Sequence, residues 1–111
     1  KLETLVEANP SQVTQAAAET LQELDLVVIS SQASRLSGEV IARTPDDKRI
    51  TVNVKPRPNG LSELTVNTGM WGDAGTGQRI INRIKAKVYS QQGMDQQEQQ
   101  GQQQQNMQQN Y

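Results

Sequence analysis

The chain has 111 residues and a mass of 12.3 kDa, and its 11 Lys and Arg against 12 Asp and Glu give a formal net charge of −1. It contains no Cys and no His, which excludes disulfides, cysteine-ligated metals, thiol nucleophiles and Ser-His-Asp catalysis. No apolar run approaches the ~20 residues of a membrane helix, and the near-zero net charge argues against a nucleic-acid-binding protein that works by bulk electrostatics.

The composition changes sharply at about Ser90. Residues 91–111 contain twelve Gln, and their apolar side chains are limited to Met94, Met107 and Tyr111. Such a tract buries too little apolar surface to offset the chain entropy that folding would cost, which favours disorder. Gln-rich tracts can also pair as β-aggregates or dock on a partner. The sequence therefore predicts one domain over residues 1–89 and a Gln-rich, low-complexity tail over residues 90–111, disordered unless a partner binds it.

The first predicted elements are a strand and a helix. Alternation over residues 2–6 predicts a short strand. Asn9 is suited to cap a helix and Pro10 to occupy its first position. Apolar residues at helical spacing then predict an amphipathic helix over residues 10–24, with Glu19 and Glu23 on its outer side.

From Asp25 the apolar period changes from helical spacing to two. Four segments alternate in this way or are strongly β-forming, and they cover residues 26–29, 36–42, 50–54 and 64–68. Turns are predicted at residues 44–47, with Pro45 in second position, and at residues 56–60. The short connections predict an antiparallel meander with one apolar and one solvated face.

A second helix is predicted over Ala74 to Tyr89, and the sheet and both helices should share one core. The apolar stripe of this second helix consists of Ile80, Ile81, Ile84 and Val88. We expect both helices to cover the apolar face of the sheet, because that face and the two apolar helix stripes can then bury one another. The predicted fold is an α+β two-layer sandwich in the order β-α-β-β-β-β-α, with the position of the first strand in the sheet left open. The residues expected to meet across the layers are Ile80, Ile84 and Val88 on the helix and Val40, Val52, Val54 and Val66 on the sheet.

Several segments together carry a resemblance to a known family. They are the helix Val13 to Leu24, the segments 25–28, 36–43 and 46–48, and, most clearly, residues 65–73 followed by Ile80-Ile81. In these residues the chain resembles an uncharacterised family of small bacterial envelope lipoproteins, a domain of unknown function, over about residues 2–88. It departs from that family at Asn67, where Arg is common, at Gly77, where Ser is frequent, and at Asp47, which replaces a frequent turn Gly.

The resemblance implies a location. Members of the family usually carry a secretion signal and a lipid-modified Cys before this region. The resemblance therefore implies a protein of the bacterial periplasm, or one anchored in the envelope, whose membrane attachment is a lipid anchor upstream of Lys1. It implies no biochemical activity.

A glycine-rich corner leads into the second helix and is one candidate binding site. Backbone amides at a helix start can cradle an anion, and an exposed Trp can anchor a partner or a sugar ring. The residues of this possible ligand or partner corner are Gly69, Trp71, Gly72, Asp73, Gly75, Gly77 and Arg79.

The corner fails the known phosphate-binding patterns. Gln78 and Arg79 stand where a phosphate-binding loop has Lys and Ser or Thr, and Ile80 stands at the third Gly of a dinucleotide-binding pattern. The favoured interpretation is structural: a tight strand-to-helix turn that needs positive φ, capped by Asp73 or Thr76, with Trp71 closing one end of the core.

The second helix is basic and forms a possible second surface. Arg79, Arg83, Lys85 and Lys87 offer charge to an acidic partner or an anionic surface, although a solvated helix face commonly has the same composition. The strands contain no aromatic residue that could stack on bases, so RNA recognition and other nucleic-acid binding are not expected.

The sequence predicts no catalytic residue, cofactor or metal site. The acid pairs Asp46/Asp47 and Glu19/Glu23 are expected at an exposed turn and on an exposed helix side, and no Ser-x-x-Lys is present. The leading hypothesis is a non-catalytic bacterial envelope module, a structural or accessory subunit that binds other envelope proteins through its sheet edge, basic helix or Gln-rich tail. The alternative is a small anion- or glycan-binding domain at the glycine-rich corner, and a hydrolase is least favoured.

Overall fold

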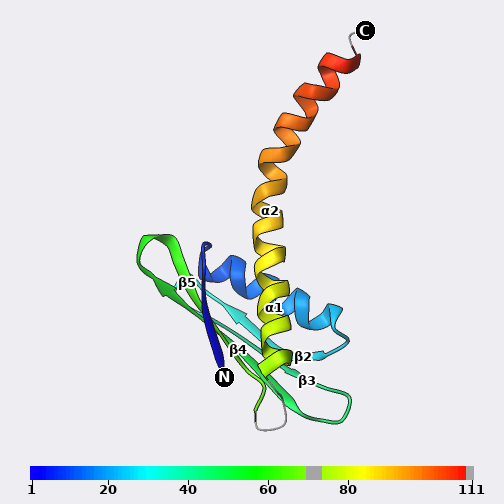
Figure 1. The fold of residues 1–111 in the computed structure, drawn as a ribbon. Helices are drawn as coiled ribbons and strands as arrows, with labels where there is room; N and C mark the ends of the chain where they lie inside the picture. The colour runs from blue at the N-terminus through cyan, green and yellow to red at the C-terminus, as the bar shows by residue number, and fades with distance from the viewer. Residues whose placement is uncertain (70–73, 110–111) are drawn as a thin grey trace.

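The structure is a computed structural model and describes residues 1–69 and 74–109. Five strands and two helices follow one another in the predicted order (Figure 1). The elements are β1 (Leu2–Val6), α1 (Pro10–Glu23), β2 (Val27–Ala33), β3 (Gly38–Arg43), β4 (Arg49–Arg57), β5 (Leu61–Asn67) and α2 (Ala74–Gln109), with a 3-10 turn at Pro58–Gly60. The predicted α+β fold is confirmed.

All five strands form one antiparallel sheet in the order β1-β5-β4-β3-β2. The first strand, whose place the sequence left open, pairs with β5, so Leu2 lies opposite Val66. In the middle of the sheet Val52 lies opposite Val40 on one side and Val66 on the other. Strands β1 and β2 are therefore the two edges.

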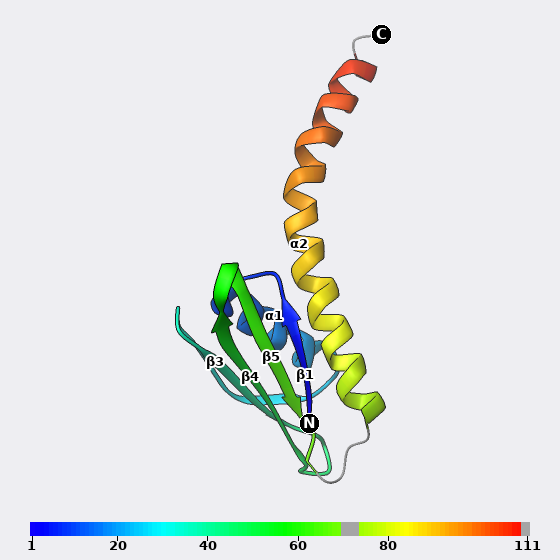
Figure 2. The same ribbon diagram turned by 60° about the vertical axis from the view of Figure 1, so that its left-hand side comes forward.

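Both helices lie on the same face of the sheet, as the sequence predicted (Figures 1 and 2). Helix α1 contacts β2, β3 and β4, whereas α2 lies over the other half and contacts β1 and β5. The two helices also contact each other. The molecule therefore has two layers, with one sheet face covered and the other facing solvent.

Local chemistry explains both ends of α1. The Asn9 side chain accepts a hydrogen bond of 2.8 Å from the Gln12 N–H, and Pro10 occupies the first turn, as predicted. At the other end Asp25 adopts a φ of 63°, and the Leu26 N–H donates to the Leu21 carbonyl oxygen at 3.0 Å. This is a Schellman-type ending built without glycine, and it turns the chain directly into β2.

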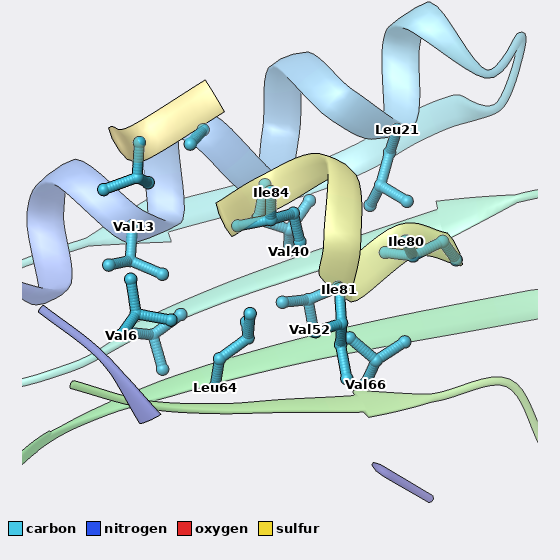
Figure 3. Packing of buried hydrophobic residues seen from close by; sticks show 14 of the residues in the cluster. Val6, Val13, Leu21, Val40, Val52, Leu64, Val66, Ile80, Ile81 and Ile84 are labelled. Atoms are coloured by element: carbon cyan, nitrogen blue, oxygen red, sulfur yellow. The ribbon is translucent and has the colours of Figure 1, made fainter. Parts of the chain in front are cut away.

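The core consists of aliphatic side chains between the layers (Figure 3). All seven residues expected to meet there are buried: Val40, Val52, Val54 and Val66 on the sheet, and Ile80, Ile84 and Val88 on α2. The predicted helix face is therefore confirmed. Valine and isoleucine fill the pleated surface well because their branched side chains are stiff.

Each helix approaches the sheet closely at a glycine. A Cβ atom on Gly38 of β3 would lie 1.7 Å from Thr14 Oγ1 of α1. The Thr14 hydroxyl is itself fixed, because it donates a 2.7 Å hydrogen bond to the Pro10 carbonyl oxygen. On α2, a Cβ on Gly77 would lie 2.9 Å from Leu2 Cδ1 of β1.

Helix α2 is longer than predicted, since it continues to Gln109 rather than ending near Tyr89. Gln is a good helix former, and no Pro interrupts the tract. The domain reaches into the predicted tail as far as Gln92, whose side-chain amide donates a 3.0 Å hydrogen bond to the Glu7 carbonyl oxygen. Because a helix without tertiary packing is marginal in water, disorder of the isolated tail stays a prediction.

Replacing Ile84 by Ala should lower the free energy of unfolding by about 2–5 kcal/mol, because it leaves a cavity in a fully buried site. Chemical denaturation measures this loss. Asn82→Ala, an exposed change on the same helix, is the control and should cost less than about 0.5 kcal/mol. Equal losses for the two variants would contradict the assigned helix face.

Gly38→Ala should destabilise the protein by about 1–3 kcal/mol or more, because its methyl group enters the space of Thr14. Gly60→Ala is the matched control, because Gly60 has a positive φ of 76° but a Cβ atom added there would meet nothing within 4 Å. It should therefore show the backbone cost alone, about 1 kcal/mol. If Gly38→Ala costs no more than Gly60→Ala, α1 does not rest on β3 at this point.

Removing residues 93–111 should leave the melting temperature unchanged. Removing residues 91–111 also deletes the Gln92 hydrogen bond to Glu7, which is exposed and contributes at most about 0.5–1.5 kcal/mol. Thermal unfolding of the two truncated chains checks both statements. A loss above about 2 kcal/mol for the shorter deletion would show that the rest of the tail packs on the domain.

Candidate functional site

The glycine-rich corner begins with a turn of the predicted kind. Gly69 has a φ of 72°, in the left-handed region that favours glycine, and its N–H donates a 2.9 Å hydrogen bond to Asn67 Oδ1. Trp71, Gly72 and Asp73 lie outside the described residues. The predictions of a buried Trp71 and an Asp73 cap therefore stay predictions.

The other residues of the corner do not converge on a common point. Gly75 is exposed, whereas Gly77 is buried under Leu2 and serves the packing of α2 against β1. Arg79 lines a groove on the side of the helix together with Leu24 and Leu26. Among the described residues of the corner, the positive charge of Arg79 therefore lies at the side of α2 and not at the amides of its first turn.

The predicted basic surface is divided into two parts. Lys87 forms ion pairs with Glu23 at 2.5 Å and with Glu19 at 3.9 Å, which joins α2 to α1. Lys85 donates a hydrogen bond of 3.4 Å to Thr4 Oγ1 on β1. These two lysines bind neighbouring elements, and the two acids expected on an outer helix side face α2 instead.

Arg79 and Arg83 remain exposed and form no ion pair with any residue in the described part of the chain. They border a groove of about 620 Å³ between the end of α1, the β3–β4 turn and the first turns of α2. Leu24, Leu26 and Ile80 contribute apolar walls. Sequence reasoning missed this groove. The left-handed turn at Asp25 brings Leu24 and Leu26 to the groove, and no glycine in the sequence indicates that turn.

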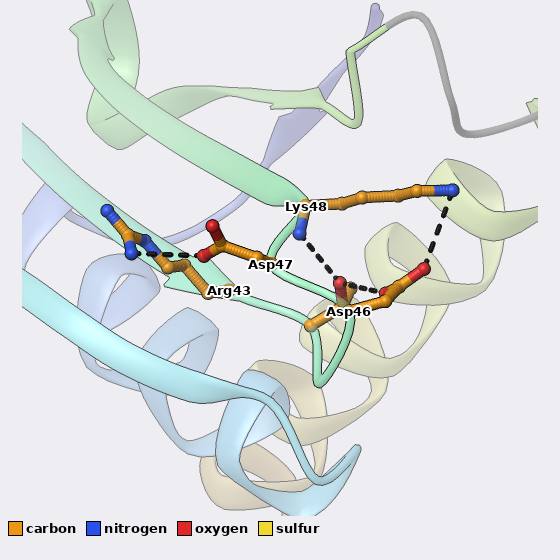
Figure 4. Close-up of polar contacts among 5 residues, drawn as sticks. Arg43, Asp46, Asp47 and Lys48 are labelled. Carbon is orange, nitrogen blue, oxygen red and sulfur yellow. Dashed lines mark hydrogen bonds and ion pairs between the residues drawn. The ribbon is translucent and has the colours of Figure 1, made fainter.

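The carboxylates of the β3–β4 turn serve the turn itself (Figure 4). The Thr44 hydroxyl donates a 2.6 Å hydrogen bond to Asp46, which holds the pKa of that carboxyl below its ordinary value, and Lys48 contributes further. Asp47 pairs with Arg43 at 3.0 Å and has a φ of 64°, a conformation that glycine adopts more easily. Asp47 therefore completes the turn in a left-handed conformation, held by its ion pair with Arg43.

Three exposed apolar side chains are spread along the β2 edge of the sheet and its hairpin turn. Val27 is 62% exposed, Ile29 45% and Leu36, in the β2–β3 turn, 76%. The other large exposed apolar side chains of the described residues, Leu5 and Tyr89, lie apart on β1 and α2. Sequence reasoning named a sheet edge as an interaction surface, but it could not tell which strand would form that edge.

Metal clusters and membrane-spanning helices are both absent from the part of the chain that the structure describes. No group of three or more His, Cys, Asp or Glu among residues 1–69 and 74–109 is placed to hold a metal ion. Within the same residues, no helix combines the length and apolar character needed to cross a membrane.

Comparison with known proteins identifies the family. No curated protein matches the chain. The family described as "Protein of unknown function (DUF3568)" matches residues 1–87, which include all five strands, α1 and α2 as far as Lys87. This match covers most of the chain and leaves out the Gln-rich tract. The chain belongs to the DUF3568 family.

Proposed function

We propose that the protein is a non-catalytic interaction module whose β2 edge pairs with an extended segment of another protein. The observation that carries this proposal is that this edge exposes three large apolar side chains along its length, Val27 and Ile29 on the strand and Leu36 in its hairpin turn. An unpaired edge strand presents a row of free backbone groups and is a template for adding a strand.

The two edges of the sheet differ in protection. Strand β1 has five residues, carries Glu3, and is followed by Glu7, whose N–H reaches the Tyr89 hydroxyl at 3.4 Å and whose carbonyl accepts from Gln92. Strand β2 has seven residues and contains neither a charge nor a proline. Short length, charge, covering side chains and β-bulges are the devices that blunt edge strands, and of these β2 has only the bulge between Val28 and Ser30.

The backbone of β2 offers specific groups to such a segment. The Ser34 N–H donates to the Ser37 carbonyl oxygen at 2.8 Å and closes the β2–β3 hairpin. Bonded and non-bonded pairs alternate along an antiparallel ladder, so Ala33 and Ser31 direct their amide groups to the open edge. The β-bulge between Val28 and Ser30 limits this regular stretch to the half of β2 next to the hairpin.

A hollow beside the hairpin adds a place for side chains of the bound segment. Its cavity volume is about 500 Å³, and Gln32, Ser37 and Lys55 are among its lining residues. Main-chain pairing gives affinity in this mode of recognition, whereas pockets for alternate side chains give specificity. The hollow therefore supports a selective partner rather than indiscriminate strand pairing.

The setting of this interaction is the bacterial envelope. We propose an accessory or structural subunit of the periplasm or of the anchored envelope, with other envelope proteins as partners and a lipid anchor upstream of Lys1 as its attachment to the membrane. The support is the resemblance in residues 36–43 and 65–73 to small envelope lipoproteins. Detection of the lipid-modified protein in membrane fractions of the native cell would test this part separately.

Three features support a non-catalytic role. The whole sequence lacks Cys and His, so the usual nucleophile–base pairs cannot form. The Asp46 carboxyl is exposed and has a lowered pKa, whereas a general acid at neutral pH needs a raised one. The acid pair Glu19/Glu23 is engaged by Lys87.

The alternative of an anion or glycan at the glycine-rich corner has weaker support. Gly77 is covered by Leu2, and of the described corner residues Arg79 alone carries a positive charge. Arg79 also belongs to the groove on the helix side, so its charge supports a ligand there rather than at the amides of the helix start.

A photo-crosslinking amino acid at Ala33, an exposed position in the regular half of β2, should capture a partner when the protein is made in its native host, and mass spectrometry then identifies that partner. The same amino acid at Glu3, on the protected edge, is the matched control and should capture that partner much less. Equal capture from both edges would contradict an interaction specific to β2.

The purified partner then allows a sharper test with Ser31→Pro, which removes an outward N–H but no bond of the internal ladder. Affinity should fall about tenfold or more, because an unpaired backbone acceptor in the partner costs about 1–3 kcal/mol. Ser31→Thr, which keeps the N–H, should bind nearly as well as the original protein. Undiminished binding by a folded Ser31→Pro protein would overturn strand addition. If that variant does not fold, Ala33→Lys, at an exposed position of the same stretch, takes its place, and unchanged affinity would overturn the proposal.

A further inference from the structure

The groove beside α2 combines an apolar floor with positive charge on its rim. Its cavity volume of about 620 Å³ lies within the range of small-molecule sites, about 300–1,000 Å³. It opens where the end of α1, the β3–β4 turn and the first turns of α2 meet. Ile50 and Ile80, both almost fully buried, close its bottom.

The walls of the groove suit a flexible aliphatic group. Leu24 and Leu26 line the side formed by α1 and its exit, and both are only half-buried. None of the described residues that line the groove is aromatic. Sugar rings and bases are usually held by stacking on aromatic side chains, so these branched aliphatic walls favour a hydrocarbon chain.

The positive charge on the rim of the groove lacks acidic partners among the described residues. Arg79, Arg83 and Lys87 follow one another at intervals of four residues and so lie along one side of α2. Lys87 is paired with both acids of α1, Glu19 and Glu23. No acid of the described residues pairs with the two arginines, although like charges one turn apart repel each other.

We propose that this groove binds a small amphiphilic carboxylate of the fatty-acid type. The two arginines hold the carboxylate, because the guanidinium group binds planar anions through two parallel hydrogen bonds. The hydrocarbon chain lies on Leu24, Leu26 and Ile80 and is thereby removed from water. This site is separate from the amides of the helix start and does not depend on the β2 edge.

The direct test is a titration of the full chain with decanoate below its micelle concentration, followed by NMR. Saturable shifts of the methyl signals of Leu24, Leu26 and Ile80 are expected. Butyrate, which has the same head group and a short chain, should bind at least about tenfold more weakly, since each buried CH₂ contributes about 0.8 kcal/mol. Equal binding of butyrate would overturn the role of the apolar walls.

The head group is tested with a charge-removing variant. Arg79→Gln combined with Arg83→Gln should weaken decanoate binding roughly tenfold or more, as expected for the loss of hydrogen bonds to a charged group. Lys55→Gln combined with Arg57→Gln removes the same charge from the distant end of β4 and should leave the affinity unchanged. Both changes lie at exposed positions, so the variants should fold.

Two further ligands separate the proposed chemistry from its neighbours. Decyltrimethylammonium has a similar chain and the opposite charge, and saturable binding in the groove as tight as that of decanoate would show apolar adsorption instead. Decyl phosphate bound about tenfold more tightly than decanoate at the same residues would assign the site to phosphate amphiphiles and overturn the carboxylate. Equal affinity of the double arginine variant and the original protein would overturn the site altogether.

Discussion

The structure depends on how closely two helices can approach a sheet when the core is made of small side chains. The chain has no Phe, and its core consists of Val, Ile, Leu and Ala. These side chains are shorter than aromatic ones. The helices must therefore pack close to the strands if the core is to contain no void. Glycine makes this possible at Gly38 under α1 and at Gly77 facing β1.

Much of this fold could be predicted because its signals are local. The cap at Asn9, the alternation of β3, β4 and β5, and the isoleucine stripe of α2 are each written within a few residues. The place of β1 could not be predicted, because its partner β5 lies about sixty residues away and five alternating residues fit many registers. The continuation of α2 through the Gln tract was also missed, since composition indicates lack of burial rather than lack of helix.

The candidate site was less accessible to sequence reasoning than the fold. Four basic residues on one helix looked like one surface, and their division depends on which part of α2 contacts α1. Lys87 lies where it reaches Glu19 and Glu23, whereas Arg79 and Arg83 lie at the groove lined by Leu24 and Leu26. No periodicity within α2 carries this information. The turn at Asp25, which brings Leu26 to the groove, could not be predicted either, because a helix end of this kind usually has glycine and rarely Asp.

The unequal protection of the two sheet edges sets a limit on the size of any assembly that forms by strand addition. A strand can be added beside β2, whereas the end of β1 is occupied by Tyr89 and Gln92 of α2. Self-pairing through β2 would relate two molecules by a twofold axis and leave only β1 edges outward. Growth would then stop at two copies, and a filament of stacked sheets could not propagate. Because strands can be added at one edge only, each chain pairs either with one partner segment or with one other copy of itself.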